Sequence, residues 1–434
     1  MTAQNRGRVI VLVFAITAGS SAGSLYYLQP LLHEVAGGLS ISATTAGLLV
    51  GAAQIGYLCG LTLLVPLGDF LERRHMVPIL LAASVVSLAV SAAASNLVML
   101  LLGTFATGLA ASAAQIVVPW ASATAAPERR SETVATVMSG LLLGILLSRL
   151  ISGAVAQFGG WRTVLIVAAG IQAIASTTVY LVAPEAERTV TTERYVDILA
   201  SIVSLIRSHS VLRQRMVLGF LIMASFSGVW TAITFLLAGL HSSPYHYSPF
   251  SIGLFALAGV AGVAGAPFAG RLADRGRLRA ITTLSWLILL ASWLLLLWGG
   301  YNEVVLVIAL LVFDLGIQSA QSTNQSAIYA LDPAARSRIT SAYMIAYFLG
   351  GVAGSTIAGF AYQSGGWLTV CEIGFIAAIF GSTLWTAFAR RSAAAARGNN
   401  APSAVHPMPV DSLNANILRP SHRRRFHSNG FYRR

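Results

Sequence analysis

Three ionisable side chains lie inside long apolar stretches of the sequence. Arg149 is the one cation in GLLLGILLSRLISG, and Asp314 and Glu372 lie in two later apolar runs. A charged side chain inside a hydrocarbon layer costs at least ~2.5 kcal/mol, so it normally faces protein or water. A buried carboxylate beside a cation suits proton transfer, because such a group can titrate as its surroundings change. These residues indicate charge compensation or proton coupling.

The composition defines the class of protein that must hold these charges. Of 434 residues, 56% are hydrophobic and 10% are charged, and the mean hydropathy is +0.73. A soluble domain carries about 25% charged residues, so the chain is predicted to be an integral membrane protein. The net charge of +13 does not indicate nucleic-acid binding, because the cations, all arginines, are scattered in short gaps between apolar runs.

The apolar runs predict an all-α membrane protein. A spanning helix needs about 20 mostly apolar residues, and period-2 alternation, the pattern of a β-barrel, is absent. The run that begins near residue 9 continues to about Leu32, so it is interpreted as an uncleaved first helix rather than a signal peptide. We expect twelve spans, at 9–32, 46–67, 77–95, 97–122, 133–156, 162–183, 216–239, 251–272, 280–299, 304–328, 339–361 and 368–389.

The arginines predict the orientation of these spans. They concentrate at the N-terminus and in the connections that follow even-numbered spans, whereas the other connections hold only Arg162. Loops rich in arginine stay in the cytoplasm, so both termini are expected inside. The arginines of the even-numbered connections are Arg73, Arg74, Arg129, Arg130, Arg188, Arg194, Arg207, Arg213, Arg215, Arg275, Arg277, Arg279, Arg336 and Arg338.

Four regions follow from this pattern. Residues 1–183 and 216–389 each hold six spans, and residues 184–215 form a cytoplasmic linker. The linker contains RYVDILASIVSLIR, whose apolar residues share one helical face, which predicts an amphipathic helix on the membrane surface. The segment 390–434 lacks periodicity and ends in basic residues, which predicts a disordered cytoplasmic tail.

The two six-span halves repeat each other. PERRSETVATVM, which begins at Pro127, matches PAARSRITSAYM, which begins at Pro333. The same offset carries Gly144 to Gly350 and the GGW at 159–161 to the GGW at 365–367, and it also carries Gln115 to Gln321. Because six is an even number of crossings, the halves are expected in parallel orientation, as two pseudo-symmetric six-helix bundles.

These features resemble the major facilitator superfamily of transporters. VPLGDFLERR lies between the second and third spans and is similar to the family loop signature G-x-x-x-D-R-x-G-R-R, from which it departs at Val65, Phe70 and Glu72. With LYYLQPLL in the first span and the glycine-rich fifth span, the chain looks like the bacterial twelve-helix drug:proton antiporter-like branch. The loop residues that match are Asp69, Arg73 and Arg74, and, in GRLADRGRLR of the second half, Gly270, Asp274, Arg275 and Arg279.

The resemblance implies roles for several positions. The six charged loop residues would form a cytoplasmic latch, although plain topological signalling would also explain the arginines. Helices 1, 4, 7 and 10 would line a central cavity, and helices 2, 5, 8 and 11 would join the halves. Gly140, Gly144 and Gly153 would then let helix 5 pack closely against the other half. The chain departs from the branch because no proline follows these glycines and Thr104 stands where the family pattern places an arginine.

Depth in the membrane predicts how the buried charges pair. At 1.5 Å per residue, Arg149 lies roughly 12 Å and Asp314 about 16 Å from the outer surface. We hypothesise that Asp314 balances Arg149 directly or through water or substrate; the alternative is that Arg149 extends to the outer interface. Glu372, roughly 7 Å deep, is expected to be a wet interfacial residue.

Polar residues near this pair predict a substrate and proton pathway. Asp314, Gln318, Gln321 and Gln325 share one stripe of the tenth span, which either faces a hydrated cavity or bonds neighbouring helices. The predicted pathway comprises Arg149, Asp314, Gln318, Gln321, Asn324, Gln115, Tyr26, Gln29, Gln54, Tyr57 and Trp230.

The resemblance implies a secondary active transporter that works by alternating access. Proton-coupled efflux of small amphipathic or drug-like molecules is the first hypothesis. Transport of a sugar or metabolite is the alternative, because the amide stripe would suit hydroxyl-rich solutes, and a non-transporting sensor is a third. No nucleophile–base pair or metal-ligand spacing occurs, so neither enzyme activity nor a metal or cofactor is expected. We expect a monomer in the bacterial inner membrane, with a small molecule, protons and lipid as partners.

Overall fold

The computed structural model describes residues 3–126, 129–184, 195–240, 243–332 and 335–399, and no strand occurs among them. Met1–Ala389 form one compact unit, and Arg390–Arg434 form a second. Helix α14 continues to Asn399, beyond the predicted start of the tail at residue 390. Residues 400–434, which were predicted to be disordered, lie outside the described residues.

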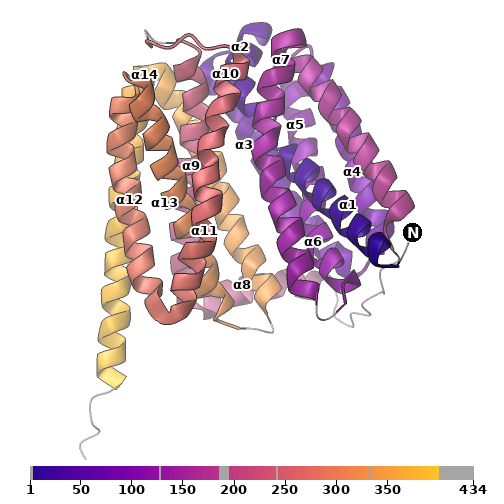
Figure 1. The fold of residues 1–434 in the computed structure, drawn as a ribbon. Coiled ribbons are helices and arrows are strands. Elements are labelled where there is room, and N and C mark those ends of the chain that lie inside the picture. The colour runs from indigo at the N-terminus through magenta and orange to yellow at the C-terminus, as the bar shows by residue number, and fades with distance from the viewer. Residues whose placement is uncertain (1–2, 127–128, 185–194, 241–242, 333–334, 400–434) are drawn as a thin grey trace, which may run out of the picture. The chain divides into compact units, whose positions relative to one another are not determined.

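The described part of each half is built almost entirely from helices (Figure 1). The first half holds α1 (Ala3–Gly23), the 3₁₀ turn η1 (Gln29–Leu31), α2 (Leu32–Leu39), α3 (Ala43–Cys59), the π turn η2 (Gly60–Leu64), η3 (Pro66–Asp69), α4 (Arg73–Ala92), α5 (Leu97–Ala111), α6 (Ala113–Thr124) and α7 (Arg130–Val182). After it come α8 (Tyr195–Ser208), α9 (Ser210–Leu237), α10 (Pro249–Leu254), η5 (Phe255–Ala258), α11 (Gly259–Leu272), the π turn η6 (Ala273–Arg277), α12 (Leu278–Gly299), α13 (Glu303–Tyr329) and α14 (Arg336–Asn399).

These elements account for the twelve predicted spans. Eight helices of the described residues are long and apolar enough to cross a membrane. Two of the eight, Glu132–Val182 and Arg338–Arg391, each contain two spans, because the backbone leaves helical geometry at a glycine within each. Two shorter apolar helices, Gly7–Gly23 and Pro249–Gly262, occupy the positions of spans 1 and 8. The predicted multi-pass helical architecture is therefore confirmed.

The repeated GGW motif forms the sharp turn within each of these long helices. Gly160 has φ 72° in α7, and Gly366 has φ 66° in α14. Positive φ is readily adopted only by glycine, which explains the residue at both turns. We call the end of the bundle that holds these turns the turn end, and the end that holds α8 the linker end; they lie at the top and bottom of Figure 1.

Four helices that begin at the turn end have capped N-termini. The side chains of Ser42, Asn96, Ser248 and Asn302 accept hydrogen bonds from backbone N–H groups in the first turns of α3, α5, α10 and α13. Such a cap stabilises a helix by about 0.5–2 kcal/mol relative to alanine. Polar residues between apolar runs therefore determine where these four helices start.

The first span is not the continuous helix that was predicted for 9–32. Helix α1 ends at Gly23, turns follow, and the chain resumes at η1 and α2. Pro30 explains part of the break, because proline has no N–H to donate along a helix. Span 4 is also interrupted, at Ser112, and span 8 is interrupted by the 3₁₀ turn η5.

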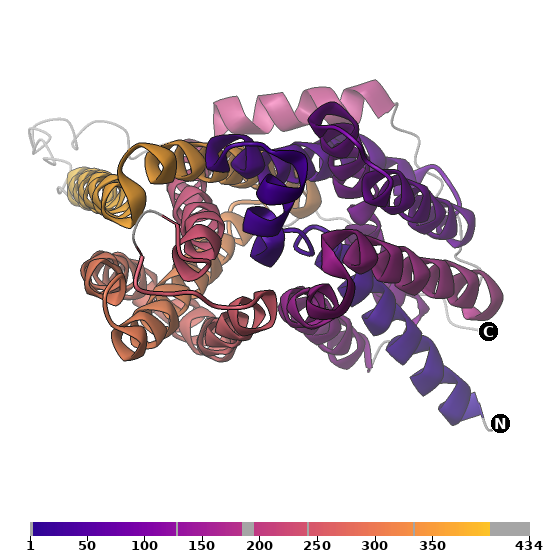
Figure 2. The same ribbon diagram turned by 90° about the horizontal axis from the view of Figure 1, so that it is seen from above.

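Glycines bring equivalent helices together within each half. A Cβ at Gly144 of α7 would lie 2.2 Å from the carbonyl oxygen of Gly19 in α1, and a Cβ at Gly350 of α14 would lie 2.1 Å from that of Phe220 in α9. Because Gly144 and Gly350 are repeat partners, the two halves use the same packing. In Figure 2 the indigo-to-magenta first half and the salmon-to-yellow second half lie side by side.

This packing corrects the predicted partner of two glycines. Gly140 and Gly144 contact α1 of their own half rather than the other half. Gly153 does reach the other half, since a Cβ there would lie 2.4 Å from the carbonyl oxygen of Pro249 in α10. The physical reason is rotation: residues 140 and 144 share one face of α7, and residue 153 lies on another.

Candidate functional site

Arg149 and Asp314 are both buried between the halves. Arg149 is 4% exposed in α7, and Asp314 is 2% exposed in α13. Their charges interact electrostatically. Among the described residues, however, no Arg149 nitrogen lies within 4.0 Å of an Asp314 oxygen. Arg149 Nη2 and both carboxylate oxygens of Asp314 have no hydrogen-bond partner. The two side chains are therefore not bonded to each other.

Arg149 is held by residues from both halves. Its Nε donates a 3.0 Å hydrogen bond to Oε1 of Gln29 in η1. Its guanidinium carbon lies 4.8 Å from the ring centre of Tyr26, and 5.5 Å and 4.5 Å from those of Phe226 and Trp230 in α9. Aromatic faces stabilise a desolvated cation, so these rings replace part of its hydration. The guanidinium therefore lies inside the bundle and does not extend to the interface.

Asp314 lies where α13 meets α11 and α9. A Cβ at Gly259 of α11 would be 3.5 Å from Oδ2 of Asp314, and one at Gly262 would be 2.7 Å from its carbonyl oxygen. The indole of Trp230 interacts with the carboxylate, although its Nε1 forms no hydrogen bond within 3.5 Å. Trp230 therefore contacts both charged residues of the site.

The close approach of α7 to α10 positions Arg149 beside the second half. A Cβ at Gly253 of α10 would lie 2.8 Å from the carbonyl oxygen of Arg149 and 3.4 Å from Cα of Gly153. Small residues at such a crossing allow backbones to approach closely. The glycines of both helices therefore bring a side chain of the first half near Asp314.

The residues of the predicted polar stripe of α13 have different surroundings in the structure. Gln321 and Asn324 are buried and bond the hydroxyl of Tyr343 in α14, Gln321 as acceptor and Asn324 as donor. Gln318 is half-buried against Gly262. Gln325 lines an open groove of about 490 Å³ between α11, α13 and α14. Thus the amides of Gln321 and Asn324 are engaged within their own half.

Arg215 is a buried cation, although the pattern of arginines predicted that it lies in a cytoplasmic connection. It lies inside α9, 5% exposed, and its Nη1 donates to Oδ1 of Asn324 at 3.1 Å. Its guanidinium carbon also lies 4.8 Å from the ring centre of Trp385. The burial of Arg215 was not predicted, because span 7 was expected to start at residue 216, whereas α9 begins at Ser210. In the sequence, the one indication was Asn324 of the polar stripe, whose side-chain oxygen needs a hydrogen-bond donor when it is buried.

The remaining predicted pathway residues join helices at mid-depth. Gln54 Nε2 donates to Ser227 Oγ of the other half at 3.0 Å. Gln115 Nε2 donates to the hydroxyl of Tyr57 at 3.0 Å, and the ring of Tyr57 lies 4.7 Å from that of Phe348. Of the predicted set, the structure gathers Tyr26, Gln29, Trp230, Arg149 and Asp314 into one cluster, which we call the charge site.

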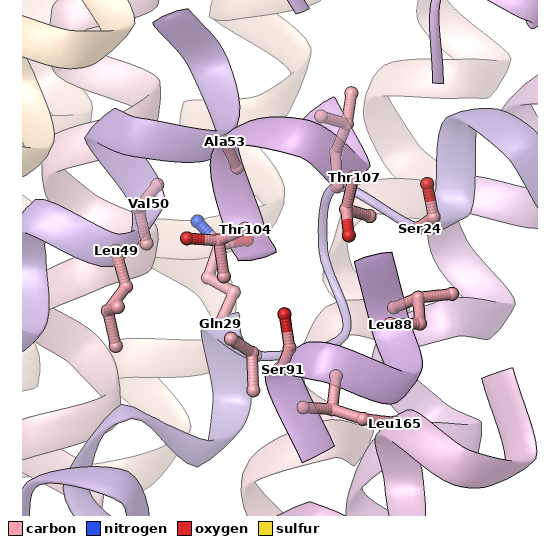
Figure 3. A pocket seen from close by; sticks show the side chains of 12 residues that line it. Ser24, Gln29, Leu49, Val50, Ala53, Leu88, Ser91, Thr104, Thr107 and Leu165 are labelled. Carbon is pink, nitrogen blue, oxygen red and sulfur yellow. The ribbon is translucent and has the colours of Figure 1, made fainter. Parts of the chain in front are cut away.

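A small cavity adjoins the charge site within the first half (Figure 3). It has room of about 20 Å³ for the centre of a water molecule, which corresponds to about one water. Gln29, Ser91 and Thr107 supply polar groups to its wall. Thr104 also lines it, and its hydroxyl donates to the carbonyl oxygen of Leu100 at 2.8 Å.

The predicted latch residues surround the linker end. Arg73 Nε donates to the carbonyl oxygen of Gly68 at 3.0 Å, which ties the start of α4 to η3. Arg74 is half-buried, and Arg275 and Arg279 are exposed. The side chains of Asp69 and Asp274 lie outside the described part of the chain.

Glu372 and Glu34 lie near the turn end. Glu372 is exposed on α14. Glu34 of α2 accepts a 3.1 Å hydrogen bond at Oε1 from the backbone N–H of Trp161, which follows the Gly160 turn. Burial raises the pKa of Glu34, and this hydrogen bond opposes the rise. Among the described residues, no group of three His, Cys, Asp or Glu side chains could hold a metal ion.

Known proteins are similar to this chain in sequence or in structure. An uncharacterized transporter of Escherichia coli O157:H7, YgaY, is 43% identical over 386 residues, which is 89% of this chain and 97% of the relative. The nucleoside transporter NupG has a similar structure, with a TM-score of 0.70 at 13% identity over 89% of this chain and 99% of NupG. A bacterial homologue of the human lysosomal transporter Spinster, in an inward-facing and occupied conformation, gives a TM-score of 0.73 at 10% identity, with 88% and 97% coverage.

The family model for the Major Facilitator Superfamily matches residues 14–355 and 245–426. These matches cover both six-helix halves, and the similar structures have the same fold. The chain is therefore a multi-pass membrane transporter that belongs to the Major Facilitator Superfamily.

Proposed function

We propose that the chain exports small amphipathic molecules in exchange for protons, by alternating access around the charge site. The observation that carries this proposal is the unbonded pair of Arg149 and Asp314. Buried charges normally have partners, so unpaired ones indicate a site that a proton or substrate completes. When Arg149 moves relative to Asp314, the affinity of the carboxylate for a proton changes, which is the requirement for coupling.

Contacts between the halves support alternating access. Thr44 Oγ1 donates to Gln363 Oε1 at 2.6 Å near the turn end, and Thr234 Oγ1 donates to the carbonyl oxygen of Gln29 at 2.8 Å beside the charge site. Both bonds cross from one half to the other. Rocking of the halves would break them and open the turn end, whereas bonds within each half would persist.

The lining of the charge site favours an amphipathic substrate over a sugar. Tyr26, Phe226 and Trp230 provide aromatic surface around Arg149. The sugar hypothesis relied on free amides along α13, but Gln321 and Asn324 bond Tyr343. Aromatic faces with a few polar groups are typical of sites for apolar molecules that carry a charge.

The distribution of arginine supports an orientation with the linker end in the cytoplasm of a bacterial inner membrane. Arg73, Arg74, Arg275 and Arg279 lie at that end. Both termini would then be cytoplasmic, and the described state would be closed toward the outside. The same arginines would act as the latch when the protein opens outward, and we expect the protein to work as a monomer.

Flux measurements in proteoliposomes test the proposal. A pH gradient should drive uptake of amphipathic drugs into vesicles that contain the wild-type chain in the inverted orientation. Asp314→Asn should abolish the driven flux. Glu303→Gln, which changes an exposed acid on the same helix, is the matched control and should behave as wild type.

Normal gradient-driven flux by Asp314→Asn would refute the role of this carboxylate. Binding of drugs to the wild-type chain without any flux would instead indicate a sensor. Driven transport of sugars, with none of amphipathic drugs, would support the metabolite alternative.

A further inference from the structure

The charge site contains buried hydrogen-bond donors and buried acceptors that lack partners. Gln29 Nε2, Arg149 Nη2 and Trp230 Nε1 are buried donor atoms without a partner. The acceptors are Oδ1 and Oδ2 of Asp314, which also lack partners. Each of these four side chains is at most 4% exposed.

The contacts between these residues place them in one site. Arg149 bonds Gln29, its guanidinium carbon lies 4.5 Å from the ring centre of Trp230, and its charge interacts with Asp314. A buried donor or acceptor without a partner costs about 1–3 kcal/mol. The free donors of Arg149 and Gln29 and the two acceptors of Asp314 would all be satisfied by one ligand that has groups of both kinds.

From this arrangement we infer that the substrate is a small zwitterion with an apolar or aromatic body, such as a hydrophobic α-amino acid. This inference rests on the proposed function and names its substrate class. The substrate carboxylate accepts hydrogen bonds from Arg149 and Gln29. The substrate ammonium group donates to Asp314, and the apolar body packs on Tyr26 and Phe226, whose rings surround the guanidinium.

A zwitterion fits the charges better than a simple anion or cation. An anion would satisfy Arg149 but face the carboxylate of Asp314, and a cation would satisfy Asp314 but face Arg149. The ammonium group also explains exchange with protons, because the substrate and the proton would compete for the same carboxylate. Export of the zwitterion would therefore leave Asp314 free to bind a proton from outside.

Three probes with one phenyl ring separate the contributions of the two charges. L-Phenylalanine carries both groups, phenethylamine carries only the ammonium, and 3-phenylpropanoate carries only the carboxylate. Binding to the purified wild-type chain is measured by ligand-induced thermal stabilisation, and transport by counterflow in proteoliposomes. Phenylalanine should bind at least about tenfold more tightly than either single-charge analogue, because each analogue leaves one pole unpaired.

Two substitutions test the partner of each charged group of the ligand separately. Asp314→Asn should remove the preference for phenylalanine over 3-phenylpropanoate, and Arg149→Gln should remove its preference over phenethylamine. Glu303→Gln and Arg162→Gln, which change exposed charges, should keep both preferences. Where a variant does not fold, the comparison of the three probes on the wild-type chain still decides the inference.

The outcomes separate this inference from the proposed function. Equal or tighter binding of either single-charge analogue, or no binding of phenylalanine, overturns the zwitterion inference. Proton-driven transport of phenethylamine without transport of phenylalanine overturns it too, but leaves proton-coupled export intact. Binding of phenylalanine with the expected preferences, but without pH-driven flux, supports the ligand class and refutes proton coupling.

Discussion

The Nε of Arg149 donates its hydrogen bond to Gln29 rather than to Asp314. This bond crosses from α7 to η1, the segment that follows the break in the first span. It fixes the guanidinium among three aromatic rings, and Nη2 remains without a partner. The break at Gly23–Pro30 therefore has a functional consequence, because a continuous helix would place Gln29 differently.

The geometry of Arg149 predicts that a positive charge alone at this position is insufficient for substrate transport. Arg149→Ala should lower substrate flux by about tenfold or more, and Arg149→Lys should restore little of it. Lysine keeps the charge, but its side chain has no equivalent of Nε. It therefore cannot donate to Gln29 and at the same time stack a planar head group on Trp230. Counterflow in proteoliposomes measures both variants, and Arg162→Lys, at an exposed position, is the control. Full activity of Arg149→Lys would show that only the charge matters.

The contact between α1 and α7 predicts a position-specific effect on stability. Gly144→Ala places a Cβ 2.2 Å from the carbonyl oxygen of Gly19, whereas Gly170→Ala, in the same helix, meets nothing within 4 Å. We expect Gly144→Ala to destabilise the protein by about 1–3 kcal/mol. Thermal unfolding of the purified variants should show a lower Tm for Gly144→Ala and an unchanged or higher Tm for Gly170→Ala. Equal Tm values would contradict the close packing of α1 and α7.

Glu34 predicts a pH dependence of stability. Burial raises its pKa above the ordinary value of 4.5, despite the hydrogen bond from Trp161. A carboxyl whose pKa is higher in the folded state favours folding below its unfolded pKa, and that contribution is lost as pH rises through the folded pKa. The wild-type Tm should therefore fall more steeply than that of Glu34→Gln as the pH rises above 4.5, the ordinary pKa of the group.

The control for Glu34 is Glu372→Gln, which changes an exposed acid and should leave the wild-type slope unchanged. Burial lowers the pKa of the neighbouring His33. His33 is present in all three proteins, so its titration contributes to every slope. Identical slopes for the wild type and Glu34→Gln would rule out this contribution.

The network around Arg215 predicts a structural role. Arg215→Ala leaves Asn324 without its donor and removes a cation from the ring of Trp385, so we expect a loss of about 1–3 kcal/mol. Arg213→Ala, two residues away on the exposed face of α9, should cost much less. Thermal unfolding compares the two, and a smaller loss for Arg215→Ala than for Arg213→Ala would count against the network.

Much of the fold follows from the sequence alone. The twelve spans could be predicted because hydropathy is a property of each residue, and a run of about 20 apolar residues needs no tertiary context. The repeated GGW was visible in the sequence, and in the structure it lies at equivalent turns at Gly160 and Gly366, where the positive φ favours glycine. The composition likewise excluded a soluble domain before any helix was placed.

The tertiary structure decided which of these residues meet. Gln321 and Asp314 share a stripe of α13, yet Gln321 bonds Tyr343 and Asp314 faces Trp230 and Arg149. Arg215 belongs to an arginine-rich region by sequence but is buried in the structure. Such partners depend on the rotation and depth of several helices at once, which hydropathy along a single segment does not specify. The sequence therefore determined which segments enter the membrane, and helix packing decided which charges share a site.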